Sequence, residues 1–187
     1  MQTRKWILGA IVSIVVCGAG FVGFAAGKAT SQESFPIVQP GKEHQWISTL
    51  AGEYTTKMTG MMGEEAGTSK TESILGGLWN VTHYDSKMMG QPFKGIEIFG
   101  YDTVRQKYVS VWVDSMSTSL TTLEGSYDQA TKTLTMRGKS TGMDGQEAVM
   151  VNRTKFRKDG MLFEMSMEGE GGPMMAIDYN RTNALSK

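Results

Sequence analysis

The chain has 187 residues, enough for one domain with short appendages. Its 19 basic residues balance its 19 acidic ones, and with Arg4 and Lys5 set apart at the N-terminus the remainder is slightly acidic. This balance excludes the basic surface on which nucleic-acid binding depends, so we expect no nucleic-acid partner. The single cysteine, Cys17, excludes a disulfide framework within the chain.

The N-terminus is predicted to be a targeting segment. Arg4 and Lys5 are followed by an uncharged, largely apolar run over residues 6–27. A run of about 20 apolar residues favours a retained membrane anchor, whereas the small residues at 25–27 are typical of a signal-peptidase site. Because the basic residues stay in the cytoplasm, both alternatives place the domain outside it. The protein is then either anchored to the cytoplasmic membrane through residues 6–27, or secreted or periplasmic after cleavage.

A short amphipathic helix is predicted after Pro40, because Trp46, Ile47 and Leu50 share one side of it and Gly52 follows as a stop signal. From there the apolar period changes to two, with turn signals every 8–14 residues or so, which indicates antiparallel strands. The ten expected strands are approximately 53–61, 67–75, 78–86, 93–101, 108–115, 119–127, 133–138, 146–156, 161–168 and 174–180.

The fold class that follows is all-β. Ten strands without crossover helices cannot form a parallel sheet, and closing the sheet removes its exposed edges. We therefore predict an up-and-down antiparallel barrel with the short helix covering one end, and a β-sandwich is the alternative. The expected divisions are an anchor or signal segment at 1–27, a tether at 28–40, the barrel domain at 41–182 and a tail at 183–187.

Several strings resemble those of a known family. They are GKEHQW at 41–46, LAGEY at 50–54, MMGQPFKG at 88–95, GYD at 100–102 and VWVDSMST at 111–118. They are similar to sequences of a bacterial family of uncharacterised proteins, the domain-of-unknown-function family numbered 1579. The resemblance spans nearly all of the predicted domain and implies a lipocalin-like barrel. It implies no established activity, and so no catalytic residue or cofactor.

The candidate ligand-binding residues lie mainly on two neighbouring strands. They are Tyr108, Trp112, Asp114, Glu97, Phe93 and His83. Tyr108, Trp112 and Asp114 share one strand face, and three valines occupy the other. If the mixed face points inward, the barrel encloses a cavity with aromatic walls and carboxylates. If the valine face points inward, the barrel is simply packed and Asp114 is solvated. We favour the first interpretation, because a carboxylate beside two aromatic rings is expensive to bury unless it is paired or used.

His83 alternates with Trp79 and Val81 and shares their strand face. If that face points into the barrel, the imidazole is either hydrogen-bonded there or available as an axial haem ligand. The spacing of the histidines indicates no zinc site. We assign no metal, cofactor or catalytic residue from the sequence.

Methionine is unusually frequent, with 15 residues in the chain. Clustered thioethers are ligands for Cu(I), but methionine also fills irregular cores and adaptable pockets. The leading hypothesis is a non-enzymatic barrel that binds a small, largely apolar molecule in its interior. The alternatives are an enzyme with a carboxylate-based site at Asp114 or Glu97, and a methionine-rich Cu(I)-binding protein.

Overall fold

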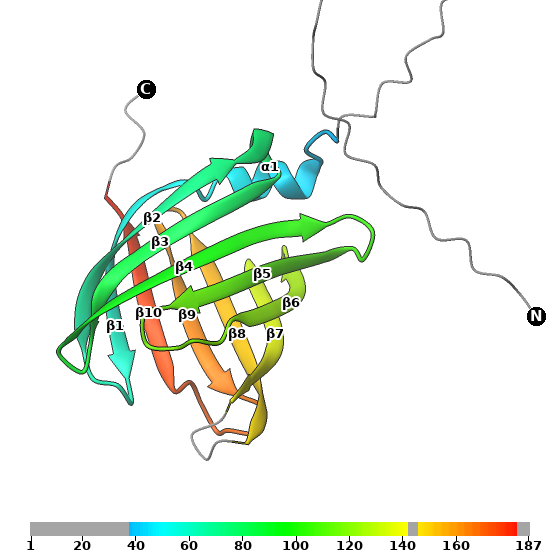
Figure 1. Cartoon of the computed structure of the whole chain (residues 1–187). Helices are drawn as coiled ribbons and strands as arrows, with labels where there is room; N and C mark the ends of the chain where they lie inside the picture. The colour runs from blue at the N-terminus through cyan, green and yellow to red at the C-terminus, as the bar shows by residue number, and fades with distance from the viewer. Residues whose placement is uncertain (1–37, 142–145, 183–187) are drawn as a thin grey trace, which may run out of the picture. The chain divides into compact units, whose positions relative to one another are not determined.

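A computed structural model describes residues 38–141 and 146–182 of the chain. They form ten strands that close into a barrel, a short helix, α1, and a single 3-10 turn, η1 (Figure 1). The elements are α1 Lys42–Ser48, β1 Gly52–Gly60, β2 Glu65–Ile74, η1 Leu75–Gly77, β3 Trp79–Met88, β4 Gln91–Asp102, β5 Lys107–Asp114, β6 Thr121–Asp128, β7 Thr133–Thr141, β8 Glu147–Arg157, β9 Gly160–Met167 and β10 Met175–Arg181.

The barrel is closed by its first and last strands. Each strand pairs antiparallel with its neighbour in sequence, and β1 pairs with β10, with Met58 opposite Ile177. No strand edge is therefore left open in the described barrel. The predicted all-β antiparallel barrel with one short helix is confirmed, and the sandwich alternative is wrong.

The anchor or signal segment predicted at 1–27 lies outside the residues that the structure describes, and it stays a prediction. Among the described residues, none of the helices has the length and apolar character needed to cross a bilayer.

A two-residue turn sets the register between β3 and β4. Met89 and Gly90 both have positive φ, 52° and 76°, the conformation of a type I′ hairpin turn. Met88 consequently pairs with Gln91, and along β4 every second residue from Phe93 to Phe99 faces the interior. Phe93 is 7% exposed on the inner face, whereas Ile96 on the outer face is 39% exposed.

Helix α1 covers one end of the barrel through its apolar side. Ile47 is fully buried, and Trp46 stacks on Tyr127 with ring centroids 4.4 Å apart. The edge of Tyr108 also meets Trp46, at 5.3 Å between centroids. A seven-residue helix is marginal by itself, so these contacts hold it in place.

The C-terminal end of α1 and the residues that follow it are fastened to the barrel by side-chain hydrogen bonds to backbone carbonyl groups. Asn80 Nδ2 donates to the carbonyl of Ile47 at 2.7 Å, and the Tyr54 hydroxyl donates to that of Leu50 at 2.7 Å. Arg181, at the end of β10, donates to the carbonyl of Ala51 at 2.8 Å. Side chains of three strands, β1, β3 and β10, thereby bind backbone carbonyls at and just after the end of the helix.

The buried apolar residues form two clusters. The first cluster lies under α1 and consists of Ile47, Phe99, Tyr108, Leu123, Leu134 and Met136. The second cluster consists of Met58, Tyr84, Phe93 and Ile177, with Trp112 and Phe163 packed against it. The candidate site draws its walls from both clusters.

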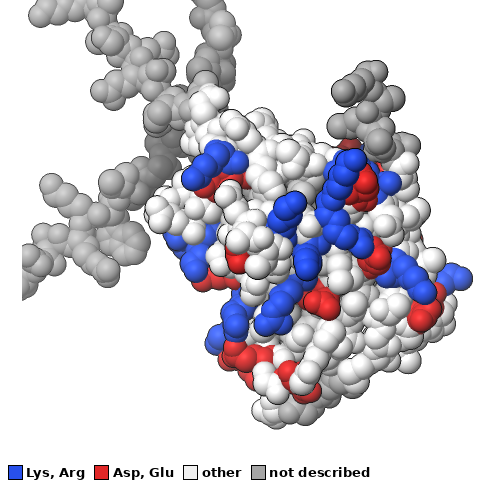
Figure 2. All heavy atoms as spheres, turned by 180° about the vertical axis from the view of Figure 1, so that it is seen from behind, with Lys and Arg blue, Asp and Glu red and all other residues white. Residues whose placement is uncertain are grey.

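Charged residues of both signs lie on the outer surface. Figure 2 shows them interspersed on the face opposite that of Figure 1, with basic and acidic side chains side by side. Arg137 pairs with Glu168, and Arg157 with Asp178, between exposed side chains. Such exposed pairs contribute little to stability, but they show that charge on the outer surface is compensated locally.

Candidate functional site

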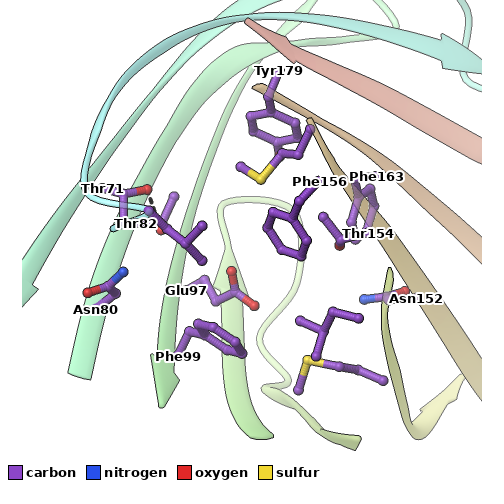
Figure 3. A pocket seen from close by; sticks show the side chains of 14 residues that line it. Thr71, Asn80, Thr82, Glu97, Phe99, Asn152, Thr154, Phe156, Phe163 and Tyr179 are labelled. Carbon is purple, nitrogen blue, oxygen red and sulfur yellow. Dashed lines mark hydrogen bonds between the residues drawn. The ribbon is translucent and has the colours of Figure 1, made fainter. Parts of the chain in front are cut away.

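A cavity of about 90 Å³ lies inside the barrel. One side of it is polar and comes from β2, β3 and β4, with Thr71, Asn80, Thr82 and Glu97. Thr71 and Thr82 satisfy each other through a hydrogen bond of 2.8 Å between their hydroxyl groups. This polar side is seen at the left of Figure 3.

The opposite side of the cavity is mainly apolar. It is formed by residues of β7, β8 and β9, namely Leu134, Met136, Phe156, Met161 and Phe163, together with the polar Asn152 and Thr154 of β8. Leu50, which follows α1, and Tyr179 of β10 complete the lining with Phe99 of β4. A few polar groups set among apolar and aromatic walls are typical of small-molecule sites.

Glu97 is the single carboxyl group in the cavity lining, and among the described lining residues there is no lysine, arginine or histidine. Figure 3 shows its side chain extending from β4 toward the opposite wall. Burial raises the pKa of Glu97, and Ser110 beside it opposes this with a smaller effect. By distance and angle, however, the Ser110 hydroxyl has no hydrogen-bond partner, so we regard burial as the governing cause.

Six buried polar side-chain atoms in the described part of the chain have no hydrogen-bond partner. They belong to Thr56, Ser69, Asn80, Tyr84, Ser110 and Asn152. The strand register places all six residues on the inner face of the barrel. Buried polar groups are nearly always satisfied by protein or by water, and the cavity exceeds the roughly 10–15 Å³ that one water requires. The interior thus contains polar groups that the protein itself does not satisfy.

Tyr179 lines the same cavity as Glu97. Burial raises the pKa of Tyr179 strongly, with smaller contributions from Tyr84 and Glu97. The ring centroids of Tyr84 and Tyr179 are 6.4 Å apart. The Tyr179 phenol and the Glu97 carboxyl group therefore share a barrel interior in which burial favours the uncharged form of each.

Five of the six sequence candidates face inward, but only Glu97 lines the cavity. Tyr108 belongs to the first cluster, where it packs against Phe99 and α1. Phe93 and Trp112 belong to the second cluster, with ring centroids 6.4 Å apart. These aromatic residues shape the two ends of the interior between which the cavity lies.

Asp114 is at the end of β5, where its carboxylate is fully engaged. One oxygen accepts a hydrogen bond from the indole N–H of Trp112 at 2.9 Å, and the other accepts one from the backbone N–H of Met116 at 2.9 Å. Asp114 therefore fixes the Trp112 ring and the start of the following loop. It does not approach the cavity that contains Glu97.

The expectation that the face of His83 points inward is wrong. The register pairs His83 with Lys70 and Ile96 on the outside of the barrel, and its side chain is exposed. The outer face of β3 and β4 is apolar enough, with Val81 and Ile96, to resemble a core-facing pattern. An axial haem ligand inside the barrel is thus not available from His83.

Sequence reasoning missed the polar residues of the cavity, among them Asn80, Thr82 and Asn152. One signal was present: β2 reads EAGTSKTESI, a strand whose inner positions are small or polar. In a closed barrel such a strand cannot supply core, so it indicates space or polar contact on its inner side.

Comparison with known proteins gives one family. The family described as "Protein of unknown function (DUF1579)" matches residues 39–181, which include α1 and all ten strands. No curated protein matches the chain. Since the match covers most of the sequence, the chain belongs to the DUF1579 family.

Proposed function

We propose that this protein binds a small molecule inside the barrel, as a non-enzymatic binder. The observation that carries the proposal is the cavity, whose apolar wall faces a polar wall; of the six unpartnered inner polar atoms, those of Asn80 and Asn152 belong to residues of the lining. A barrel evolved only for stability gains nothing from buried polar groups that lack partners, because each of them lowers the free energy of unfolding by about 1–3 kcal/mol.

The size and lining of the cavity restrict the ligand. An engineered cavity of about 150 Å³ takes up benzene, so about 90 Å³ suits a molecule of a few heavy atoms. Phe156 and Phe163 supply contact for an apolar body, and Thr82, Asn152 and Glu97 supply hydrogen-bonding groups. The expected ligand is therefore small and largely apolar, with one polar group.

The lining gives less support to a carboxylate-based enzyme. Acid–base chemistry of that kind generally uses two carboxyl groups whose pKa values differ. Glu97 is the one carboxyl group of the described lining, and Asp114 is held by Trp112 and Met116 at the strand end. The methionines point to packing more than to copper: Met58 is buried in the second cluster, with Met88 and Met175 packed against that cluster beside aromatic rings.

The test is an NMR titration of the full chain with isobutanol, a neutral molecule with an aliphatic body and one hydroxyl group. We expect saturable shifts of backbone amides that surround the cavity, such as those of Thr82, Phe99 and Phe163. Thr154→Phe places a ring in the cavity and should abolish these shifts. The matched control is Lys155→Phe, which adds the same ring on the outer face of β8.

The two variants separate binding in the cavity from binding elsewhere. Shifts confined to outer residues, or wild-type binding by Thr154→Phe, would show that the interior takes up no ligand. Thermal unfolding of both variants verifies that each is folded at the titration temperature.

A further inference from the structure

The buried Glu97 carboxyl group has no basic side chain of the described strands available to pair with it. By register, Arg181 is the one lysine, arginine or histidine that faces inward from the described strands. Its guanidinium is already bound to the carbonyls of Ala51 and Thr49 and to the Tyr54 hydroxyl. Glu97 therefore has no free counter-ion among the residues of the described strands, and a buried carboxylate is stable only when it is paired.

Aromatic rings surround the same space. Phe99, Phe156, Phe163 and Tyr179 all line the cavity with Glu97, and Figure 3 shows them on several sides of the space that the carboxyl group enters. The faces of such rings carry negative electrostatic potential and attract cations, most strongly where water is excluded. A carboxyl group among aromatic faces forms an environment complementary to positive charge.

The other ligand classes fit this lining less well. An anion would meet Glu97 and find no cation among the described lining residues. A hydrocarbon would leave Glu97 and the polar wall without partners. A neutral hydroxyl compound would satisfy a hydrogen bond but would leave the aromatic rings and the ionisable carboxyl group without a cation. A small ammonium group pairs with the Glu97 carboxylate, interacts favourably with the aromatic rings and has N–H groups left for the polar wall.

On this basis we propose that the ligand is a small protonated aliphatic amine, whose ammonium group binds the Glu97 carboxylate and whose alkyl group packs against Phe156 and Phe163. This inference rests on the proposed function, since it assigns the chemical class of the ligand in the same cavity. Thr82, opposite Glu97 in the register of β3 and β4, is placed to accept a second hydrogen bond from the ammonium group.

The experiment compares three molecules of nearly equal shape on the full chain at pH 7.5: isobutylamine, isobutanol and isobutyrate. They are respectively cationic, neutral and anionic. Dissociation constants come from amide shifts of the cavity residues. We expect isobutylamine to bind at least about tenfold more tightly than isobutanol, as a charge-assisted contact in a desolvated site should, and isobutyrate to bind most weakly.

Glu97→Gln keeps the shape of the side chain but removes its charge. We expect this variant to lose about tenfold or more in affinity for isobutylamine, while its affinity for isobutanol stays within about threefold of wild type. A matched outer-face variant is Glu72→Gln, which should change neither value because Glu72 pairs with exposed Lys70.

The outcomes distinguish the two proposals. Equal or tighter binding of isobutanol or isobutyrate, or unchanged amine affinity in Glu97→Gln, overturns the amine assignment and leaves cavity binding intact. Absence of cavity shifts with all three molecules overturns the proposed function itself. Preserved amide spectra in Glu97→Gln establish that a loss of amine binding does not come from misfolding.

Discussion

The indole ring of Trp112 lies so close over Gly95 that a β-carbon at position 95 would be 2.1 Å from the ring. Gly95 on β4 faces inward opposite Asp114 of β5, and the indole occupies the space that a side chain would take. A glycine in mid-strand normally weakens a sheet. Here the absence of a side chain at Gly95 lets the Trp112 ring pack directly on the β4 backbone, beside the second cluster.

Gly95→Ala should therefore destabilise the protein. The added methyl group displaces the Trp112 ring and with it the hydrogen bond to Asp114, and overpacking of this kind costs about 1–3 kcal/mol. Urea unfolding gives the free energy, and near-ultraviolet circular dichroism reports the indole. Gly171→Ala is the control, because an added β-carbon at Gly171 meets nothing within 4 Å. Equal stability of the two variants would show that the ring is free to move.

Trp112 and Val111 are adjacent in β5 but lie on opposite faces of the barrel. Trp112→Ala removes an inner ring of the second cluster and should lower the free energy of unfolding by about 3 kcal/mol. Val111 is 37% exposed on the outer face, so Val111→Ala should cost less than about 1 kcal/mol. Chemical denaturation of the two variants decides the matter. A larger loss in Val111→Ala would contradict the inward direction of Trp112.

Asn80 holds the end of α1, so Asn80→Asp should release the helix. The aspartate lacks the N–H that binds the Ile47 carbonyl and introduces a charge at a site that is 1% exposed. We expect a loss of about 2–4 kcal/mol and faster amide hydrogen exchange over residues 42–51. Ser73→Ala removes only an exposed hydroxyl contact to Ser48, at 3.2 Å, and serves as control. Unchanged exchange in Asn80→Asp would show that the apolar contacts alone hold α1.

Glu97 should make stability depend on pH. Its pKa is raised by burial in the folded state, so the folded protein binds more protons than the unfolded chain above the ordinary carboxyl range. Its contribution to stability is then greatest near or below pH 4 and declines as pH rises toward the folded pKa, by up to about 1.4 kcal/mol per pH unit. Glu97→Gln should remove that decline, as thermal unfolding from pH 4 to pH 8 will measure.

The control for this pH series is Glu72→Gln. Lys70 lowers the pKa of the Glu72 carboxyl group on the outer surface, so the contribution of Glu72 to stability is lost as the pH falls. Glu72→Gln should therefore change the stability only at acid pH and leave the decline at higher pH in place. If the stability of the wild type does not fall above pH 4, or if it falls equally in Glu97→Gln, the buried position of the Glu97 carboxyl group is contradicted.

The existence of the strands was predictable from the sequence because their signals are local, but the boundaries were less so. The expected strands 78–86 and 93–101 leave residues 87–92 between them, whereas the structure turns within Met89 and Gly90 and begins β4 at Gln91. The inward face was not predictable from apolar pattern, since Ile96 and Ile98 lie outside while Phe93 and Phe99 lie inside. With apolar residues on both faces, a period of two carries little information about direction. The error at His83 has this same cause.

Glu97 was a candidate from the sequence, but its surroundings were not. The cavity joins Thr82 of β3 to Thr154 and Phe163 of β8 and β9, residues that meet only when the barrel closes. Their proximity depends on the register of several successive strand pairs. The apolar periodicity of a single strand does not predict which residues of distant strands meet across the interior.

The pairing of β1 with β10 makes the order of synthesis matter. Residues 52–60 leave the ribosome first among the strands, and their partner at 175–181 leaves it last. Until then the growing sheet has two open edges that can pair with other chains. Closure of the barrel therefore has to wait until β10 has emerged, and shortening the chain within β10 should yield aggregated protein instead of a smaller folded one.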